Sequence, residues 1–303
     1  MIIGSGAFAV SGDLRLWTER FGDPADPAVL LIMGTSAQGI GWPDEMVEAL
    51  VEGGRQVIRF DHRDTGHSDC VDFTAHPYTL ADMAADAVAV LDEHEIAAAH
   101  IVGASLGGAI GQWLAVHRRE RVLTLTAIMT SPMGNNAGPA WMRAMTGQAP
   151  ALDELPPPAT RFLRHLTRRA STPATTREER VDAALETWRV LNGEASLFDE
   201  RAARQYVEAS DDRTGDHAAA THHDLAGRQM TDDRLAPLSS ITAPTLVIHG
   251  TEDPIFPLPH GRRLAEQVPN ARLRTIPGMG HGFFSPGLPR QIAEIILKHT
   301  ATP

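Results

Sequence analysis

The 303-residue sequence contains a single cysteine, Cys70, so the chain cannot form an internal disulfide bond. Nothing around Cys70 has the pattern of a turn that exposes a nucleophile, and we expect a packed or loop thiol. Long hydrophobic runs are absent as well, since no apolar stretch is long enough to span a bilayer. Residues 1–5 lack a basic region and have only a short apolar run, which is typical of a first strand rather than a signal peptide. These features predict a cytoplasmic protein that does not bind membranes.

Positive charge is also scarce: 27 lysines and arginines stand against 38 acidic residues, and the formal net charge at pH 7 is −11. This surplus of negative charge disfavours nucleic acid and anionic membrane surfaces as partners. The pair His222–His223, followed by Asp224, has the composition of a metal site, but adjacent histidines point in different directions on a helix. We therefore expect them at the surface of a helical segment or in a pocket wall, and we predict neither a metal nor an organic cofactor.

Short apolar runs rich in β-branched residues alternate with helical patterns along most of the chain. This alternation predicts an α/β fold, with a mostly parallel sheet and helices on both faces. The length suits one large α/β domain with an inserted helical lid. We expect residues 1–132 and 238–303 to form the core and residues 133–237 to form the lid, because prolines gather at both ends of that segment and helical stretches fill it.

The expected lid contains many large apolar side chains. Helical stretches are predicted near Thr160–Arg169, Thr176–Leu191 and Asp199–Ala220. Most of the apolar side chains are expected to form the lid's own core, and a minority that face the site would make a wide apolar pocket. Trp141 and Trp188 are the candidate substrate-binding residues.

The most informative segment is Ala99–Gly108, in which a short apolar strand runs into the motif Gly-x-Ser-x-Gly at residues 103–107 and then into a helical pattern. That motif between a strand and a helix is typical of a nucleophile elbow, a tight turn that pushes the hydroxyl of the serine, here Ser105, out of the sheet. Glycines at both ends of the motif suit the close backbone approach of such a turn. The alternative is a glycine-rich turn that carries a surface serine.

A serine nucleophile needs a general base and an acid that orients the base. The apolar run of residues 244–250 leads directly into Glu252 and Asp253, and an acid just past a strand's carboxyl end lies where an open parallel sheet builds its site. The next expected strand, residues 271–276, leads into a glycine-rich loop that contains His281. Serine, acid and histidine then follow one of the chain orders in which such triads occur. We expect Asp253 and His281 to act with the serine as the catalytic residues, with Glu252 as the rival acid.

The oxyanion that forms during acyl transfer needs two preorganised backbone N–H groups. One is expected from Leu106, the residue after the serine. The other is expected from the loop that follows the apolar strand near residues 28–32. There Thr35 follows the turn at Gly34 and is the candidate donor, and a threonine that merely caps or closes a turn is the alternative.

Together these motifs resemble the α/β-hydrolase superfamily over nearly the whole chain and, within it, the aclacinomycin methylesterase group of polyketide tailoring esterases. The segments that carry the resemblance to that group, beside the serine motif, are Phe21–Pro27, Gly41–Glu45, Ile58–Ser68, Ala75–Tyr78, Asp253–Ile255, Pro259–Gly261 and Ile276–His281. The resemblance implies the α/β-hydrolase fold and a serine esterase without a cofactor. Residues 133–237 contribute little to it.

We interpret the sequence as that of a serine carboxylic-ester hydrolase that forms an acyl-enzyme with a bulky, hydrophobic small-molecule ester. The resemblance implies the methyl ester of a polyketide antibiotic as the favoured substrate, with a macrolide-type lactone as the second choice. A carbon–carbon bond hydrolase and a haloperoxidase-like α/β hydrolase use the same triad and remain alternatives. The non-enzymatic alternative is a ligand-binding receptor on an intact hydrolase fold.

Overall fold

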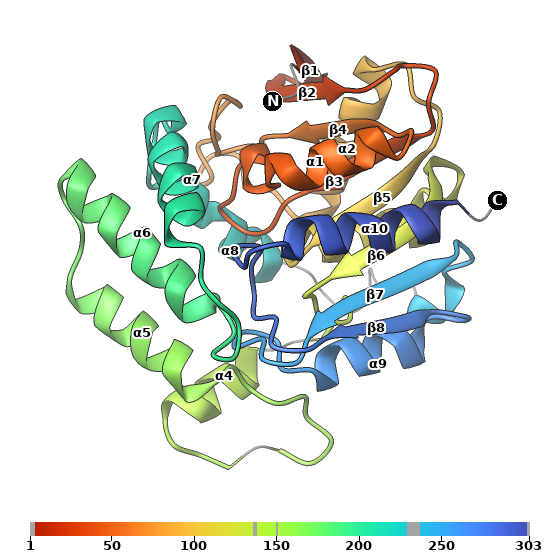
Figure 1. Ribbon diagram of the computed structural model, residues 1–303. Coiled ribbons are helices and arrows are strands. Elements are labelled where there is room, and N and C mark those ends of the chain that lie inside the picture. The colour runs from red at the N-terminus through yellow and green to blue at the C-terminus, as the bar shows by residue number, and fades with distance from the viewer. Residues whose placement is uncertain (1–3, 136–137, 150, 229–236, 302–303) are drawn as a thin grey trace.

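The computed structural model describes residues 4–135, 138–149, 151–228 and 237–301, which contain a sheet of eight strands (Figure 1). The strand order is β1-β2-β4-β3-β5-β6-β7-β8. β2 runs antiparallel to both β1 and β4, and all further pairs are parallel. The expected α/β fold with a mostly parallel sheet is confirmed. The strands are β1 (Ser5–Ser11), β2 (Leu14–Phe21), β3 (Ala28–Ile32), β4 (Gln56–Phe60), β5 (Ala99–Ala104), β6 (Val122–Ile128), β7 (Thr245–Gly250) and β8 (Arg272–Ile276).

Helices cover both faces of the sheet, as the alternating pattern predicted. On one face α1 (Asp44–Glu52) and α10 (Leu288–Thr300) share an apolar core with the strands. On the other face α2 (Leu80–Glu93), α3 (Leu106–His117) and α9 (Pro259–Gln267) form a second core. Because both sides are covered, β3, β4, β5 and β7 are buried at every residue, and most of their side chains are apolar.

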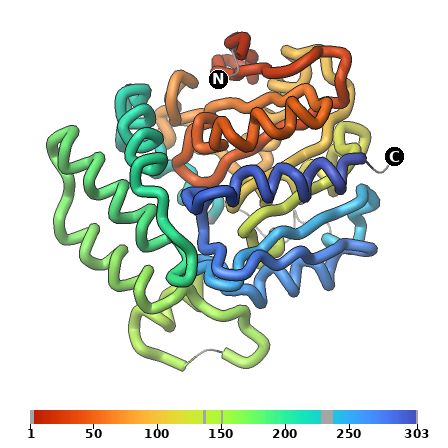
Figure 2. Tube along the Cα trace, in the orientation of Figure 1, coloured from red at the N-terminus to blue at the C-terminus, as the bar shows by residue number. Residues whose placement is uncertain are grey.

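The chain leaves the sheet after β6 and returns at β7, and the described residues between them are largely helical. Figures 1 and 2 show α5, α6 and α7 projecting to one side of the α/β layers. The helices of this inserted segment are α4 (Gly138–Met145), α5 (Thr160–Ser171), α6 (Arg177–Leu191), α7 (Glu200–Arg213) and α8 (His222–Arg228).

The sequence patterns place α5 and α6 within two residues of their ends, but the expected helix to Ala220 stops earlier. α7 ends at Arg213, and Thr214 already has the extended dihedral angles φ −86° and ψ 117°. The next residue is Gly215, and glycine is a poor helix former because helix formation costs it more backbone entropy than other residues. A separate 3-10 turn follows at Ala219–Thr221.

Two expectations concern the start of the chain and membranes. β1 begins at Ser5, and residues 1–3 of the expected first strand lie outside the described residues. Within the described ranges, none of the helices is long and apolar enough to cross a bilayer.

Candidate active site

Ser105 occupies the single-residue turn between β5 and α3. Its backbone has φ 53° and ψ −116°, a left-handed conformation that costs free energy in any residue with a Cβ atom. The flanking glycines are required by contact: a Cβ on Gly103 would lie 2.0 Å from the carbonyl oxygen of Gly107. A Cβ on Gly107 would lie equally close, 2.0 Å, to the carbonyl oxygen of Ile32. The local geometry is therefore that of a strained elbow with the serine at its tip.

Asp253 and His281 form a closed, buried pair. His281 Nδ1 lies 2.8 Å from Asp253 Oδ2. The other carboxylate oxygen accepts hydrogen bonds from the backbone N–H groups of Ile255 at 2.8 Å and Phe256 at 2.9 Å. Burial opposes ionisation of Asp253, but the charge and hydrogen bond of His281 outweigh it and hold the pKa of the carboxyl below its usual value. An ionised carboxylate only accepts, so Nδ1 of the imidazole carries the proton and Nε2 keeps a free lone pair.

Backbone hydrogen bonds connect Ser105, at the end of β5, through the end of β6 to β7, the strand that precedes Asp253. The N–H of Ser105 donates to the carbonyl of Ile128 at 2.9 Å, and the N–H of Met129 donates to the carbonyl of Ile248 in β7 at 2.9 Å. Ser105 uses only its backbone in the hydrogen bonds that it makes among the described residues, so its hydroxyl is unengaged. A serine–histidine hydrogen bond that closes only when substrate binds is compatible with this arrangement.

Glu252, the rival acid, points to another part of the molecule. Its Oε2 accepts a hydrogen bond from the N–H of Ala195 at 3.0 Å, in the segment that links α6 to α7. Its carbonyl accepts a hydrogen bond from Arg161 of α5 at 3.3 Å. The structure thus joins His281 to Asp253 and uses Glu252 to hold the inserted segment.

The two expected oxyanion donors lie on either side of the serine. Leu106 is the first residue of α3, whose start has no side-chain cap. Thr35 is exposed and makes no hydrogen bond to another described residue. Its neighbour Gly34 approaches the serine closely, since a Cβ there would lie 3.2 Å from the Cβ of Ser105. Two amides beside the elbow are therefore free to bind an oxygen.

The two candidate pocket tryptophans have different surroundings. Trp188 of α6 packs edge-on against Phe284 with 5.0 Å between ring centroids, and against Tyr206 at 5.7 Å. It also covers the loop of the expected base, because a Cβ on Gly282 would lie 3.2 Å from its ring. Trp141 of α4 lies edge-on against Phe162 at 6.1 Å, inside the inserted segment.

Sequence reasoning missed a second histidine at the acid. His249 Nε2 lies 2.7 Å from the carbonyl oxygen of Phe256 and 3.7 Å from Asp253 Oδ2. Burial lowers the pKa of His249, so the ring is neutral and donates to that carbonyl. The spacing of four residues between His249 and Asp253 was the only sequence signal for this contact. It was missed because His249 lies in the largely apolar run of β7, which predicts a buried strand and no polar contact.

The other polar clusters of the sequence have no catalytic geometry. His222 Nδ1 lies 3.1 Å from Asp64, and His223 is buried. Across the residues described, no group of three or more His, Cys, Asp or Glu side chains is arranged to hold a metal ion. Cys70 is exposed, and partial burial, chiefly, raises the pKa of its thiol, whereas a nucleophilic cysteine needs a lowered pKa.

Comparisons with known proteins show the family and the fold of the chain. A family model described as "alpha/beta hydrolase fold" matches residues 27–288. The chain is 42% identical to the rhodomycin D methylesterase DnrP of Streptomyces peucetius and 41% identical to the rhodomycin D methylesterase DauP of Streptomyces sp. strain C5. Each alignment spans 290 residues, which is 95% of this chain and 95% of the relative. The solved structure of the esterase RhEst1 from a Rhodococcus species matches with a TM-score of 0.74 over 98% of this chain and 99% of that chain, at 20% identity, which bears on the fold alone.

Proposed function

The chain belongs to the α/β-hydrolase family and is a carboxylic-ester hydrolase, and from that premise we propose that it removes the methyl group from a methyl ester of a polyketide antibiotic such as rhodomycin D. Two relatives with 42% and 41% identity over 95% of the chain carry the name rhodomycin D methylesterase, which supports this substrate class. The resemblance to polyketide tailoring esterases in the sequence is confirmed by the same relatives.

In the proposed mechanism Ser105 Oγ attacks the ester carbonyl while His281 Nε2 takes the hydroxyl proton. The tetrahedral intermediate collapses, the methoxy group takes that proton from His281, and methanol leaves an acyl-enzyme. His281 then takes a proton from water, the resulting hydroxide attacks the acyl-enzyme, and the carboxylic acid and free serine are released. Asp253 holds the imidazole in the tautomer that keeps Nε2 free and stabilises its charged form.

The negative oxygen of each tetrahedral intermediate would be bound by two backbone N–H groups. Leu106 offers the first at the start of α3, where the helix dipole also favours negative charge. Thr35 offers the second, and its amide has no competing partner among the described residues. A donor without a partner does not have to break a hydrogen bond before it binds the oxyanion.

One observation carries the proposal: the buried Asp253–His281 pair and a serine with a strained φ of 53° all follow the carboxyl ends of parallel strands, at one edge of the sheet. Backbone strain at a serine is costly, and it persists where the surrounding structure holds it. The turn places the half-buried serine directly after the carboxyl end of β5, which is the position that an acyl-transfer mechanism at such an elbow requires.

We propose further that residues 133–237 form a lid over a core of residues 1–132 and 238–303, and that the lid supplies the pocket for the rings of a bulky ester. The contact between Trp188 and Gly282 supports this, because it brings α6 to the loop of His281. Trp141 is proposed as a second pocket residue.

We propose that the binding partner of the protein is its small-molecule ester substrate and that the protein does not bind nucleic acid. The net charge of −11 supports this exclusion. The single cysteine, which cannot form a disulfide within the chain, supports a cytoplasmic location.

The test is to incubate the purified protein with rhodomycin D and to follow the product by mass spectrometry. The expected product is the free acid, lighter than the substrate by one methylene group, and the Ser105→Ala variant is expected to form none. A macrolactone run beside it would gain the mass of one water if it were opened. Unchanged rhodomycin D in the presence of an active enzyme, as judged by p-nitrophenyl acetate, would overturn the proposed substrate.

A further inference from the structure

Ser36, the residue after the proposed oxyanion donor Thr35, has a left-handed backbone with φ 58°. A non-glycine residue adopts this conformation at a cost and keeps it only where neighbouring groups hold it. Two hydrogen bonds that Ser36 donates to the inserted segment hold this conformation. The N–H of Ser36 donates to His223 Nδ1 at 3.0 Å, and its hydroxyl donates to the carbonyl of Ala220 at 2.7 Å.

His223 is buried, with 1% of its surface exposed, and both of its ring nitrogens are used. Nδ1 accepts from Ser36, so the proton lies on Nε2, which donates to the carbonyl of Arg63 at 2.8 Å. The ring is therefore neutral and in one defined tautomer. Burial, chiefly, lowers its pKa to about 4, and the titratable groups that face it are His62, Asp64 and Asp224, beside the backbone carbonyl of Arg63.

A second neutral histidine, His62 of the core, contacts the start of the same loop at Met33. His62 Nε2 donates to the carbonyl of Met33 at 2.9 Å. The His62 and His223 rings meet edge to face, with 5.5 Å between their centroids. The residues from Met33 to Ser36, and with them the amide of Thr35, therefore lie between one histidine of the core and one of the inserted segment.

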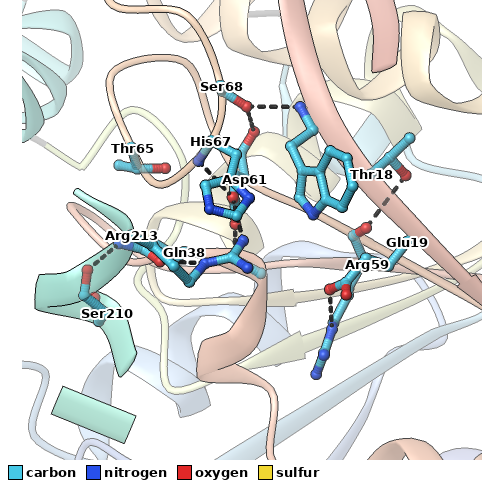
Figure 3. A network of polar contacts seen from close by, with 12 residues as sticks. Thr18, Glu19, Gln38, Arg59, Asp61, Thr65, His67, Ser68, Ser210 and Arg213 are labelled. Atoms are coloured by element: carbon cyan, nitrogen blue, oxygen red, sulfur yellow. Dashed lines mark hydrogen bonds and ion pairs between the residues drawn. The ribbon is translucent and has the colours of Figure 1, made fainter. Parts of the chain in front are cut away.

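The loop is anchored to the inserted segment once more, just beyond Ser36 (Figure 3). The Gln38 side chain donates to the carbonyl of Ser210 at 2.8 Å and accepts from Arg213 at 3.0 Å. Arg213 also pairs with Asp61, which accepts from the N–H of Gly39 at 2.8 Å. The hydrogen bonds of Gln38 and Gly39 thus fix the part of the loop that follows Ser36. The conformation at Ser36 itself then depends on its hydrogen bonds to His223 and Ala220.

We propose that His223 is a positioning residue for catalysis: by accepting the Ser36 N–H, it aims the neighbouring Thr35 amide at the oxyanion. The inference rests on the proposed function, because it needs an acyl-transfer step at Ser105. It gives α8 a role beyond covering the site, since the inserted segment then completes the catalytic geometry of the core. His223 was expected from the sequence only as lid surface or pocket wall.

The two side-chain amides offer a matched pair of variants. In His223→Asn, an amide oxygen replaces Nδ1 and still accepts from Ser36, whereas in His223→Gln the amide reaches the place of Nε2 and keeps only the Arg63 contact. With p-nitrophenyl acetate, we expect His223→Gln to lower kcat about 10- to 100-fold at nearly unchanged KM, since a misplaced oxyanion donor acts on the transition state. We expect His223→Asn to stay within about threefold of the parent.

Three further measurements separate positioning from folding. His222→Asn, at the neighbouring position of α8, is the control and is expected to keep kcat. Affinity for a trifluoromethyl ketone, whose adduct carries the oxyanion, is expected to fall in His223→Gln by the same factor as kcat/KM. Ser36→Ala removes the Ala220 bond alone and is expected to lower kcat by a smaller factor.

Several results would overturn the inference. One is equal activity of the Asn and Gln variants, and another is a change in KM alone. A third is an unchanged ketone affinity with a lowered melting temperature, which would make His223 merely structural. If the parent shows serine-dependent turnover and His223→Gln matches it, the inference fails and the proposed function stands. If the parent shows no serine-dependent turnover, the proposed function fails first and takes the inference with it.

Discussion

Arg213 and Asp61 form an ion pair of 2.6 Å that joins the C-terminal end of α7 to the loop after β4. Asp61 is 1% exposed, and it also accepts from the N–H groups of Gly39 and His67. Figure 3 shows Arg213 reaching toward this carboxylate, with Gln38 beside it and hydrogen-bonded to it. Among the described residues, Arg213 is the cation that pairs with this buried carboxylate, so the inserted segment and the core depend on one another for stability.

Removal of that partner is expected to destabilise the fold. Arg213→Met leaves Asp61 buried without its counter-charge, which costs about 3–5 kcal/mol of unfolding free energy. Urea unfolding at pH 7 measures the loss. The control is Arg189→Met, which breaks the exposed pair with Glu200 and is expected to cost no more than about 1 kcal/mol. Equal, small losses in both variants would show that Asp61 is satisfied by its backbone donors alone.

Ser105→Ala is expected to remove catalysis without harming the fold. The hydroxyl forms the acyl-enzyme, so kcat on any ester should fall by roughly three decades or more, while substrate still binds. Steady-state kinetics and equilibrium binding of the same ester check the two halves of this prediction. Turnover near the parent's rate would exclude the serine mechanism.

Asp253→Asn should be far more damaging than the change of its neighbour. An amide at this place favours the wrong tautomer of His281, so kcat is expected to fall by up to about four decades. Glu252→Gln removes a contact to Ala195 and is expected to leave kcat within about tenfold. Measuring both variants with one activated ester decides the assignment, and a reversed order of damage would move the acid by one residue.

Stability is expected to fall in mild acid because buried histidines must take up protons. Burial, chiefly, lowers the pKa of His62 to about 4 from 6.5. The unfolded chain therefore binds the proton first, so the stabilisation is full above about pH 6.5 and is lost as the pH falls toward 4. The loss for this one group is roughly 3 kcal/mol.

The matched variant for this effect is His62→Gln, whose amide can still donate to the Met33 carbonyl but does not titrate. Urea unfolding of the parent and the variant at pH 7 and about pH 4.5 should give a smaller loss in the variant. Parallel losses in the two proteins would assign the acid sensitivity to other groups.

The two tryptophans are expected to differ in what they affect. Trp188 packs against Phe284, Tyr206 and the His281 loop, so Trp188→Ala should lower the melting temperature and kcat/KM for both esters, with a larger loss for the bulky ester that also needs the pocket. Trp141→Ala is expected to depress kcat/KM for a bulky methyl ester at least tenfold more than for p-nitrophenyl acetate, because only the large substrate needs the pocket. An unchanged ratio of the two rates would remove Trp141 from the pocket.

Local sequence predicted most of the core because its signals are short-range. The largely apolar runs of β3, β5 and β7 and the glycines around Ser105 indicate their conformations within a few residues. The pairing of Asp253 with His281 could be expected from their positions just after strands, since parallel strands bring their carboxyl ends to one edge of the sheet. The end of α7 was predicted less well. The residues after Thr214 still have a composition that favours a helix, but the helical backbone ends at Arg213.

The sequence by itself determined the α/β fold, the serine elbow and the order of the proposed triad, since each depends on residue type at fixed, short spacing. Only the tertiary structure decided that Glu252 turns away to Ala195 and that His223 accepts a hydrogen bond from Ser36, beside the proposed oxyanion donor. The hydrogen bond between Ser36 and His223 joins residues 187 positions apart. No local pattern encodes such a contact, because it arises only when burial forces a histidine and a strained amide to satisfy one another.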